Sequence, residues 1–110
     1  MNERDEASLR DMLDAARHAR TFMIGKTREM LDSDDMLSFA VVRALEIVGE
    51  AAGRISAETR ATLQDIPWKD VIGMRNKIIH EYDQVDFNIV WVTVEENLPP
   101  LISALEKYLS

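Results

Sequence analysis

The sequence predicts an all-α fold, an antiparallel bundle of four to five helices built by a single domain over residues 1–110. Two observations predict it. Residues that favour helices are abundant, whereas four glycines and three prolines are too few for the turns of a many-stranded fold. Apolar residues also recur every three or four positions along most of the chain, as on a helix face that packs against a core.

Two long amphipathic segments occupy the first half of the chain. Apolar residues at helical spacing over residues 5–31 predict a first helix of about seven turns. Ser33 suits the N-cap of the next helix, and Asp34 and Asp35 suit the positive end of a helix dipole. The second helix is therefore predicted over residues 34–55.

Two small features follow from the same spacing. Gly49 and Gly53 lie one turn apart in the second helix, where glycine is costly, so we interpret the pair as permitting a close helix crossing. The alternative is a ligand contact at these glycines. Ser56 is predicted to cap a short helix over residues 57–63.

The second half contains two further predicted helices. Pro67 marks a loop, because proline disfavours helical geometry in the residue before it. A third long helix is predicted over residues 69–82. Asp86 is predicted to cap a fourth, which Pro99 and Pro100 should kink or split in two.

The composition excludes several classes of protein. Without cysteine there are no disulfides or thiolate metal sites, and two distant histidines make a poor zinc set, so no metal or other cofactor is expected. The first ten residues are charged and do not form a signal peptide, and no apolar run approaches a membrane span. We therefore expect a cytoplasmic protein without membrane contacts.

The net charge of −7 counts against broad binding to nucleic acid, and no DNA partner is expected. Binding to RNA would need a local basic cluster on this acidic body. The cationic residues that can form one are Arg54, Arg60, Lys69, Arg75 and Lys77.

One short stretch concentrates the side chains that can carry chemistry, namely Arg75, Asn76, Lys77, His80 and Tyr82. On the predicted helix, Arg75 and Tyr82 would project on nearly the same side, and Asn76 and His80 would stack one turn apart.

These side chains match what a metal-free ribonuclease needs. Histidine exchanges protons near neutral pH, and the arginine fork matches phosphate oxygens. His80 would take the proton from a 2′-hydroxyl, and Arg75 would stabilise the charge that develops on the phosphoryl group. Asn76 would orient His80 or bind a phosphate oxygen. The residues alone leave open that Arg75 and His80 are ordinary surface residues.

The stretch resembles the R-x4-H-x-Y motif of HepT-like proteins in the HEPN superfamily. Arg75, His80 and Tyr82 occupy the motif positions, and Asn76 fits the polar residue favoured after the arginine. Flanking segments resemble the family as well, and together they cover about residues 36–105. They are Arg43–Ala52, Ile66–Trp68, Gly73–Asn76, Asp86–Trp91 and Leu98–Leu101.

The resemblance implies a HEPN-like helical fold and a homodimer in which the Arg75–His80 motifs face each other at the interface. It implies metal-independent RNA cleavage by the toxin half of a two-gene toxin–antitoxin pair. The implied partner is an MNT-type nucleotidyltransferase that silences the toxin by transferring AMP to Tyr82. Lys69, Lys77 and Arg54 are the expected RNA contacts. The alternative function is a non-catalytic helical subunit that binds nucleotide or docks onto a nucleotidyltransferase.

Other residues keep two interpretations. His18, beside Arg17 and Arg20, belongs to a solvated helix face or, together with Arg10, touches RNA. Trp68 and Trp91 are core or interface anchors, or else base-stacking surfaces.

The acidic residues of the second helix and the motif tyrosine are equally open. Glu46, Glu50 and Arg54 favour a salt-bridged helix face, and the alternative is that one carboxylate orients Arg75 or His80. Tyr82 is the AMP acceptor, or it packs at the end of its helix.

Overall fold

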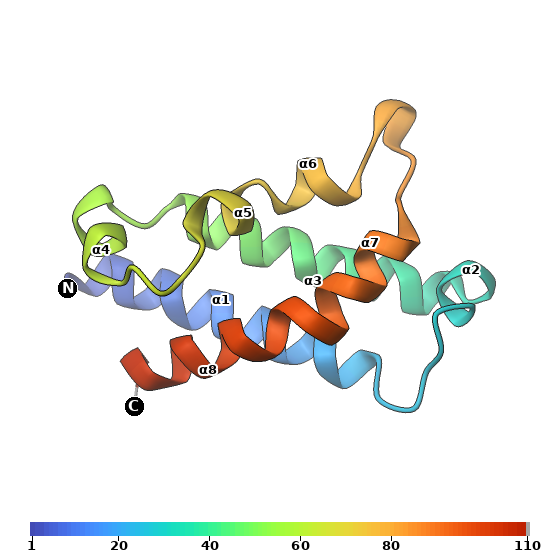
Figure 1. The fold of residues 1–110 in the computed structure, drawn as a ribbon, viewed down its shortest axis with the longest axis horizontal. Helices are drawn as coiled ribbons and strands as arrows, with labels where there is room; N and C mark the ends of the chain where they lie inside the picture. The colour runs from blue at the N-terminus through green and yellow to red at the C-terminus, as the bar shows by residue number, and fades with distance from the viewer. Residues whose placement is uncertain (110) are drawn as a thin grey trace.

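The computed structural model describes residues 1–109, so the last residue of the predicted domain lies outside the described part. Its helices are α1 (Glu3–Phe22), α2 (Met30–Ser33), α3 (Asp35–Gly53), α4 (Ala57–Thr62), α5 (Trp68–Ile72), α6 (Met74–Ile78), α7 (Phe87–Val92) and α8 (Leu98–Leu109). A 3₁₀ turn at Glu81–Asp83 and a π-helical turn at Thr93–Asn97 complete the set (Figure 1). The predicted all-α fold is confirmed. Within the described residues, no helix is both long and apolar enough to cross a membrane.

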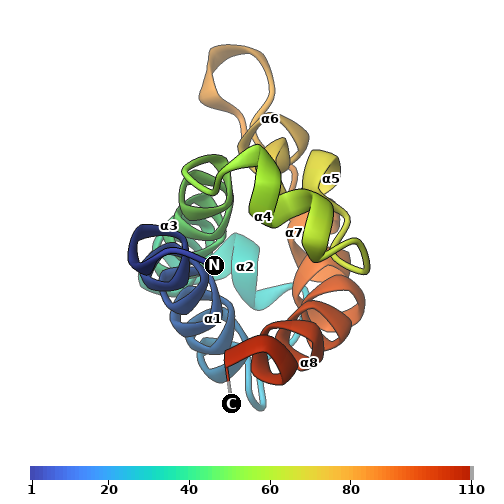
Figure 2. The same ribbon diagram turned by 90° about the vertical axis from the view of Figure 1, so that its left-hand side faces the viewer.

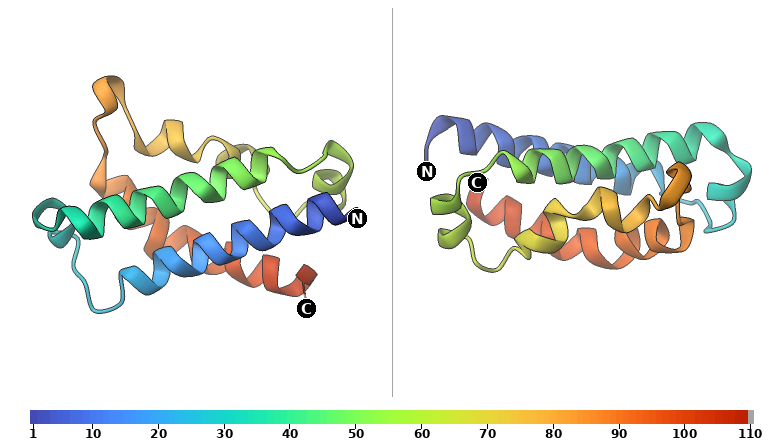
Figure 3. Two further views of the ribbon diagram at one scale, coloured as in Figure 1. Left: turned by 180° about the vertical axis from the view of Figure 1, so that it is seen from behind. Right: turned by 90° about the horizontal axis from the view of Figure 1, so that it is seen from above.

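The helices surround one core (Figure 2). α1 and α3 lie side by side and antiparallel, and the α7–α8 segment runs back along α1 (Figure 3). α5 and α6 lie along α3, and α4 closes the end that holds the N-terminus. The inner faces supply the core, whose fully buried members include Leu9, Met12, Val41, Leu45, Val48, Ile78, Val90, Val94, Leu98 and Leu105.

The first helix is shorter than predicted. α1 ends at Phe22, and the chain turns at Gly25, whose φ of +72° is a conformation that glycine adopts without steric cost. Leu31 is nevertheless buried, which explains why the apolar spacing continued past the true end of the helix. Ser33 ends α2 and is not the N-cap of α3. That position belongs to Asp34, whose carboxylate accepts from the Leu37 backbone N–H at 3.1 Å.

Only one of the two helix glycines permits close packing. A Cβ on Gly49 would lie 3.1 Å from the Val71 carbonyl oxygen, so glycine there allows α5 to approach α3. Gly53, at the end of α3, faces open space. The predicted crossing is thus right for Gly49 and wrong for Gly53.

The predicted third helix over residues 69–82 is wrong. It is two short helices that meet at Gly73, and α6 ends at Ile78. Ile79 then adopts extended backbone and forms an isolated antiparallel bridge with Val85. Helical spacing persisted because Met74 and Ile78 still face the core.

The last predicted helix is interrupted directly before the proline pair, where the π-helical turn Thr93–Asn97 separates α7 from α8. Asp86 caps α7 as predicted, with its Oδ1 accepting from the backbone N–H groups of Asn88 and Ile89. Pro99 and Pro100 are the second and third residues of α8, which follows the π-helical turn directly. Because proline lacks an N–H and clashes with the carbonyl four residues earlier, a widened turn before it is a recognised accommodation.

A buried carboxylate joins the N-terminus to α4. Asp5, only 1% exposed, accepts from the Ser56 hydroxyl at 2.6 Å, the Thr59 hydroxyl at 2.5 Å and the Ser56 backbone N–H at 3.0 Å. These hydrogen bonds, with that of the Ser56 hydroxyl the largest, lower the pKa of Asp5 from its ordinary value.

Replacing this carboxylate should destabilise the fold. Because the folded pKa of Asp5 is lowered, its contribution is complete above about pH 3.8 and is lost as pH falls through the folded pKa. Asp5→Asn is expected to lower the Tm at neutral pH by about 5 °C or more, and to flatten the acid limb of a plot of Tm against pH. Asp14→Asn, on the exposed face of α1, is the control. Equal Tm losses in both variants would contradict this role.

Candidate active site

The motif residues lie on α6 and on the loop that follows it. Arg75, Asn76 and Lys77 are exposed on α6, whereas His80 and Tyr82 lie beyond its end. The loop projects from the bundle between α6 and α7 (Figure 1). The helix-face relations expected between Arg75 and Tyr82, and between Asn76 and His80, therefore do not exist.

Backbone hydrogen bonds close the base of this loop. The His80 N–H donates to the Gln84 carbonyl at 2.7 Å, and the Asp86 N–H donates to the Ile78 carbonyl at 2.8 Å. Together with the Ile79–Val85 bridge they hold His80 at the base of the loop, beside the start of α7.

Tyr82 occupies the tip. Its φ of +59° is unusual for a bulky residue, and its side chain is 94% exposed. The interpretation that Tyr82 packs at a helix end is therefore wrong.

Arg75 is oriented by a carboxylate from α3. Its Nε donates to Glu46 Oε2 at 3.2 Å, with the Glu46 side chain 21% exposed and that of Arg75 56% exposed. The two terminal nitrogens of the Arg75 guanidinium make no hydrogen bond within the described residues. They face solvent and can bind an oxyanion in a fork geometry. The alternative in which an acidic residue of this helix contacts the motif is confirmed for Glu46.

The predicted salt-bridged face exists on α3, but the partners differ from those that the spacing suggested. Glu50 pairs with Arg43 at 2.8 Å, and Arg54 pairs with Asp11 of α1 at 3.3 Å, so Glu50 and Arg54 do not pair with each other.

His80 has an acidic neighbour that the sequence reasoning missed. Asp86 uses Oδ1 to cap α7, and its Oδ2 lies 3.6 Å from His80 Nε2. That distance suits an ion pair with a protonated imidazole and is too long for a hydrogen bond. The sequence reasoning had placed Asp86 at the N-cap of the next helix, but the loop closure that brings it to His80 has no sequence signal of its own. Asn76, expected to orient His80, makes no hydrogen bond to it.

The basic residues separate into two groups. Lys69 and Lys77 are exposed on α5 and α6, the helices that lead to the motif, and neither has an ion-pair partner within residues 1–109. Arg54 is paired toward α1, and Arg60 donates to the carbonyl oxygen of Gly53 at 3.1 Å. Only Lys69 and Lys77 lie on the α5–α6 segment that leads to the motif. In the same described range, no three His, Asp or Glu side chains are grouped to hold a metal ion.

Comparison with known proteins identifies the family. The profile described as Ribonuclease HepT-like matches residues 12–108. The chain belongs to the HepT-like ribonuclease family. It is therefore an RNA-cleaving enzyme with the all-helical fold that the motif implied.

Individual relatives agree with this family. The chain is 35% identical to "Putative RNase MJ1380" of Methanocaldococcus jannaschii over 107 residues, which covers 96% of this chain and 98% of the relative. It is 43% identical to "Probable ribonuclease HepT" of Thermococcus cleftensis over 74 residues, 67% of each chain. It is 41% identical to "Putative RNase TTE0752" of Caldanaerobacter subterraneus over 76 residues, which covers 69% of this chain and 68% of the relative. No solved structure matches the chain significantly.

Two other regions of this HepT-like chain carry structural residues. On α1, Arg17 pairs with Glu106 and Arg20 with Glu95, while His18 stacks on Phe22 with ring centroids 5.9 Å apart. His18 is exposed, as expected of a solvated helix face, and the alternative of an RNA contact there stays a prediction.

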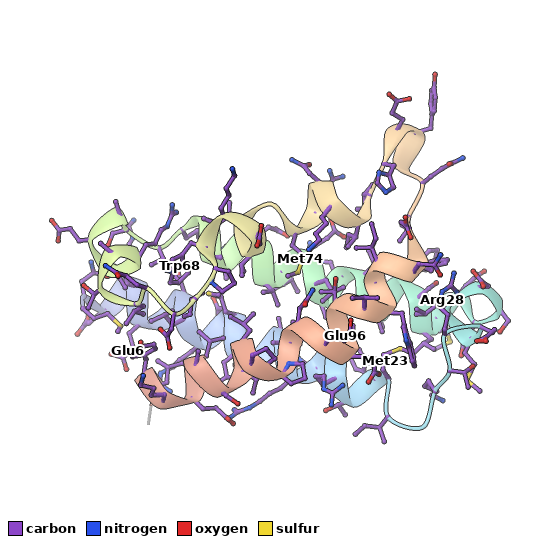
Figure 4. The ribbon with its side chains drawn as sticks, viewed as in Figure 1. Glu6, Met23, Arg28, Trp68, Met74 and Glu96 are labelled. Atoms are coloured by element: carbon purple, nitrogen blue, oxygen red, sulfur yellow. The ribbon has the colours of Figure 1, made fainter. Side chains whose placement is uncertain are left out.

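The tryptophans are core anchors. Trp68 is half-buried against the core and donates its indole N–H to the Leu63 carbonyl at 3.0 Å (Figure 4). Trp91 is half-buried against the same core.

Proposed function

We propose that this HepT-like ribonuclease is the toxin subunit of a cytoplasmic toxin–antitoxin pair. It cleaves RNA without a metal ion through Arg75 and His80, and an MNT-type nucleotidyltransferase silences it by AMP transfer to Tyr82. The observation that carries the proposal is the pairing of each group with one carboxylate. Glu46 contacts Arg75 and Asp86 contacts His80, while both motif side chains remain more than half exposed to substrate.

The chemistry follows from the two side chains. Unprotonated His80 takes the proton of a 2′-hydroxyl, and that oxygen forms a bond to the adjacent phosphorus. The bond from phosphorus to the 5′-oxygen breaks, and that oxygen takes the proton back from the His80 imidazolium, leaving a 2′,3′-cyclic phosphate and a 5′-hydroxyl. Arg75 stabilises the charge on the non-bridging oxygens. Lys69 and Lys77 bind neighbouring phosphates, and Asn76 is an additional polar contact.

A two-fold dimer is part of this proposal. One chain supplies one Arg75 and one His80, which make no hydrogen bond or ion pair with each other in the described structure. The exposed face of α3 that carries Glu46 also carries Met36 and Phe39, which are 85% and 75% exposed. Apolar side chains this exposed favour burial against a partner, and a two-fold axis through this face would double the catalytic groups.

Exposure of Tyr82 supports its part in the proposal. The phenol stands at the tip of a closed loop, where a second enzyme can reach it without unfolding the bundle. It is also two residues from His80, so an added nucleotide would lie near the proposed RNA site.

Glu46 is expected to act as a positioning residue for Arg75. An exposed ion pair of this kind contributes about 0.2–1 kcal/mol, so Glu46→Ala should lower kcat/KM for RNA by about 2- to 5-fold. Glu46→Gln keeps an acceptor for Nε and should restore most of the activity. Glu50→Ala removes a carboxylate one turn away that does not touch Arg75, and it should change little. Faster cleavage by Glu46→Ala would contradict positioning and indicate that Glu46 only repels RNA.

The test of the function is cleavage of RNA by the purified protein in the presence of EDTA, with His80→Ala as the inactive variant. Equal product from both proteins would refute the assignment of the catalytic residues. No product from the wild type would favour the non-catalytic docking subunit.

A further inference from the structure

A cavity of about 390 Å³ lies on the side of α6 that carries Lys77. It opens between α5–α6 and the segment formed by the π-helical turn and the start of α8. Its apolar wall includes Val71, Met74 and Leu101, and Met74 is seen in Figure 4 between α6 and the α7–α8 segment. The volume is within the range of about 300–1,000 Å³ that is usual for small-ligand sites.

Several polar groups at this cavity are not used by the fold. The side chains of Asp70, Lys77 and Asn97 line it, are exposed, and have no hydrogen-bond or ion-pair partner within residues 1–109. The Thr93 side chain lines it as well, is 98% buried, and its Oγ1 has no hydrogen-bond partner. A buried hydroxyl without a partner is rare and calls for an explanation. Rotation about the Cα–Cβ bond of Thr93 exchanges its hydroxyl with its methyl group, and helical threonine adopts both rotamers.

The charges around the cavity limit what it can bind. Asp65 and Asp70 disfavour a phosphate inside it, whereas Lys77 at its edge favours one just outside. Carboxylate and amide oxygens accept hydrogen bonds from the exocyclic amino group of a base, as acidic side chains do from cytosine N4. Apolar walls suit the flat faces of a base that has left its stack.

We propose that this cavity is a base-binding subsite for an RNA nucleotide that carries an exocyclic amino group, next to the scissile phosphate. The inference rests on the proposed function, because Lys77 lines the cavity and follows Arg75 by two residues on α6, so an RNA strand that contacts both side chains would pass along this helix. The base enters between Met74 and Leu101, and its phosphate binds Lys77. The subsite therefore selects adenine, cytosine or guanine over uracil beside the cleaved bond.

The test measures binding separately from cleavage. Short 2′-O-methyl RNAs cannot undergo 2′-hydroxyl attack, so their Kd can be measured by calorimetry on the intact protein. Oligonucleotides that contain cytosine or adenine are expected to bind at least about 5-fold more tightly than an all-uracil one, the worth of roughly one hydrogen bond. Free cytidine and uridine form a second arm. If the free nucleosides bind more tightly than the RNAs, and the RNAs show no preference for one base over another, the RNA subsite is overturned.

Matched variants locate the effect. Ala104 lines the cavity, and the exposed neighbour Ser103 does not, so Ala104→Leu should abolish the base preference while Ser103→Leu keeps it. Thr93→Val has nearly the same shape and removes only the hydroxyl. Asp70→Asn is exposed and serves if Ala104→Leu does not fold. Thr93→Val and Asp70→Asn should each reduce the preference for cytosine or adenine over uracil by about 2-fold or more.

The two proposals can fail separately. A base preference that is unchanged in all three cavity variants would overturn the subsite and leave the ribonuclease intact. Preference without cleavage of unmodified RNA would overturn the catalytic assignment and keep the subsite.

Discussion

His80→Ala is expected to reduce the rate of RNA cleavage by about 10²- to 10⁴-fold, the usual contribution of a general base. Arg75→Ala should cost about 10²- to 10³-fold, as for loss of one group that stabilises transition-state charge. Both side chains are more than half exposed, so neither change leaves a core cavity, and the Tm of each variant should stay near that of the wild type. The measurement is the initial rate of cleavage of a labelled RNA at saturating enzyme.

His18→Ala is the matched control, since it removes the chain's other histidine from a surface that is not part of the site. Its rate should equal that of the wild type. EDTA should leave every rate unchanged, and restoration of activity by Mg²⁺ after chelation would contradict the metal-free mechanism.

Mixing the two inactive variants tests whether the site is shared between chains. In the proposed dimer, Arg75 of the His80→Ala chain would face His80 of the Arg75→Ala chain, so one composite site would be complete. Recovery of about a quarter of the wild-type activity after subunit exchange is expected, because half of the dimers are mixed and each has one complete site of two. No recovery from a mixture shown to contain mixed dimers would indicate that each chain holds its own site.

The sequence predicted the bundle because its evidence was distributed over many residues. Apolar spacing along α1, α3 and α8 reports burial, and burial dominates the fold. The two errors in helix length lie where apolar side chains reach the core from beyond the end of the helix. Leu31 lies beyond the turn at Gly25, and Ile79 belongs to a bridge rather than a helix, yet both continue the helical spacing.

The candidate site was predicted unevenly for the same reason. Arg75, His80 and Tyr82 were identified from their types and order, which do not depend on backbone conformation. Their partners depend on how distant segments meet, and periodicity contains no information about that. Glu46 lies on α3 and Arg75 on α6, and Gly49 allows the α5–α6 segment to lie close to α3. Asp86 reaches His80 only because the loop closes through the Ile79–Val85 bridge.

Tyr82→Phe is expected to cleave RNA within about 2-fold of the wild type and to escape silencing completely. The side chain is 94% exposed, so removal of the phenolic oxygen costs no packing and leaves the loop unchanged. In the wild type, the Tyr82 oxygen would attack the α-phosphorus of ATP, the bond to pyrophosphate would break, and the phenolic proton would pass to a base of the transferring enzyme. The attached phosphate would add negative charge two residues from His80, where it repels the RNA backbone, and the nucleoside would occupy the adjacent space.

The other tyrosine of the chain provides the control for this prediction. Tyr108 donates its hydroxyl to Asp65 at 2.5 Å, and this hydrogen bond, together with burial, raises the pKa of Tyr108. Its oxygen is therefore engaged and harder to ionise, so it is a poor acceptor of AMP. After incubation with the nucleotidyltransferase and ATP, intact-mass spectrometry should show one added AMP on the wild type and on Tyr108→Phe, and none on Tyr82→Phe. An AMP adduct on Tyr82→Phe that also stops its RNA cleavage would show that the acceptor lies elsewhere, and the proposed control of this enzyme through the loop tip would then be wrong.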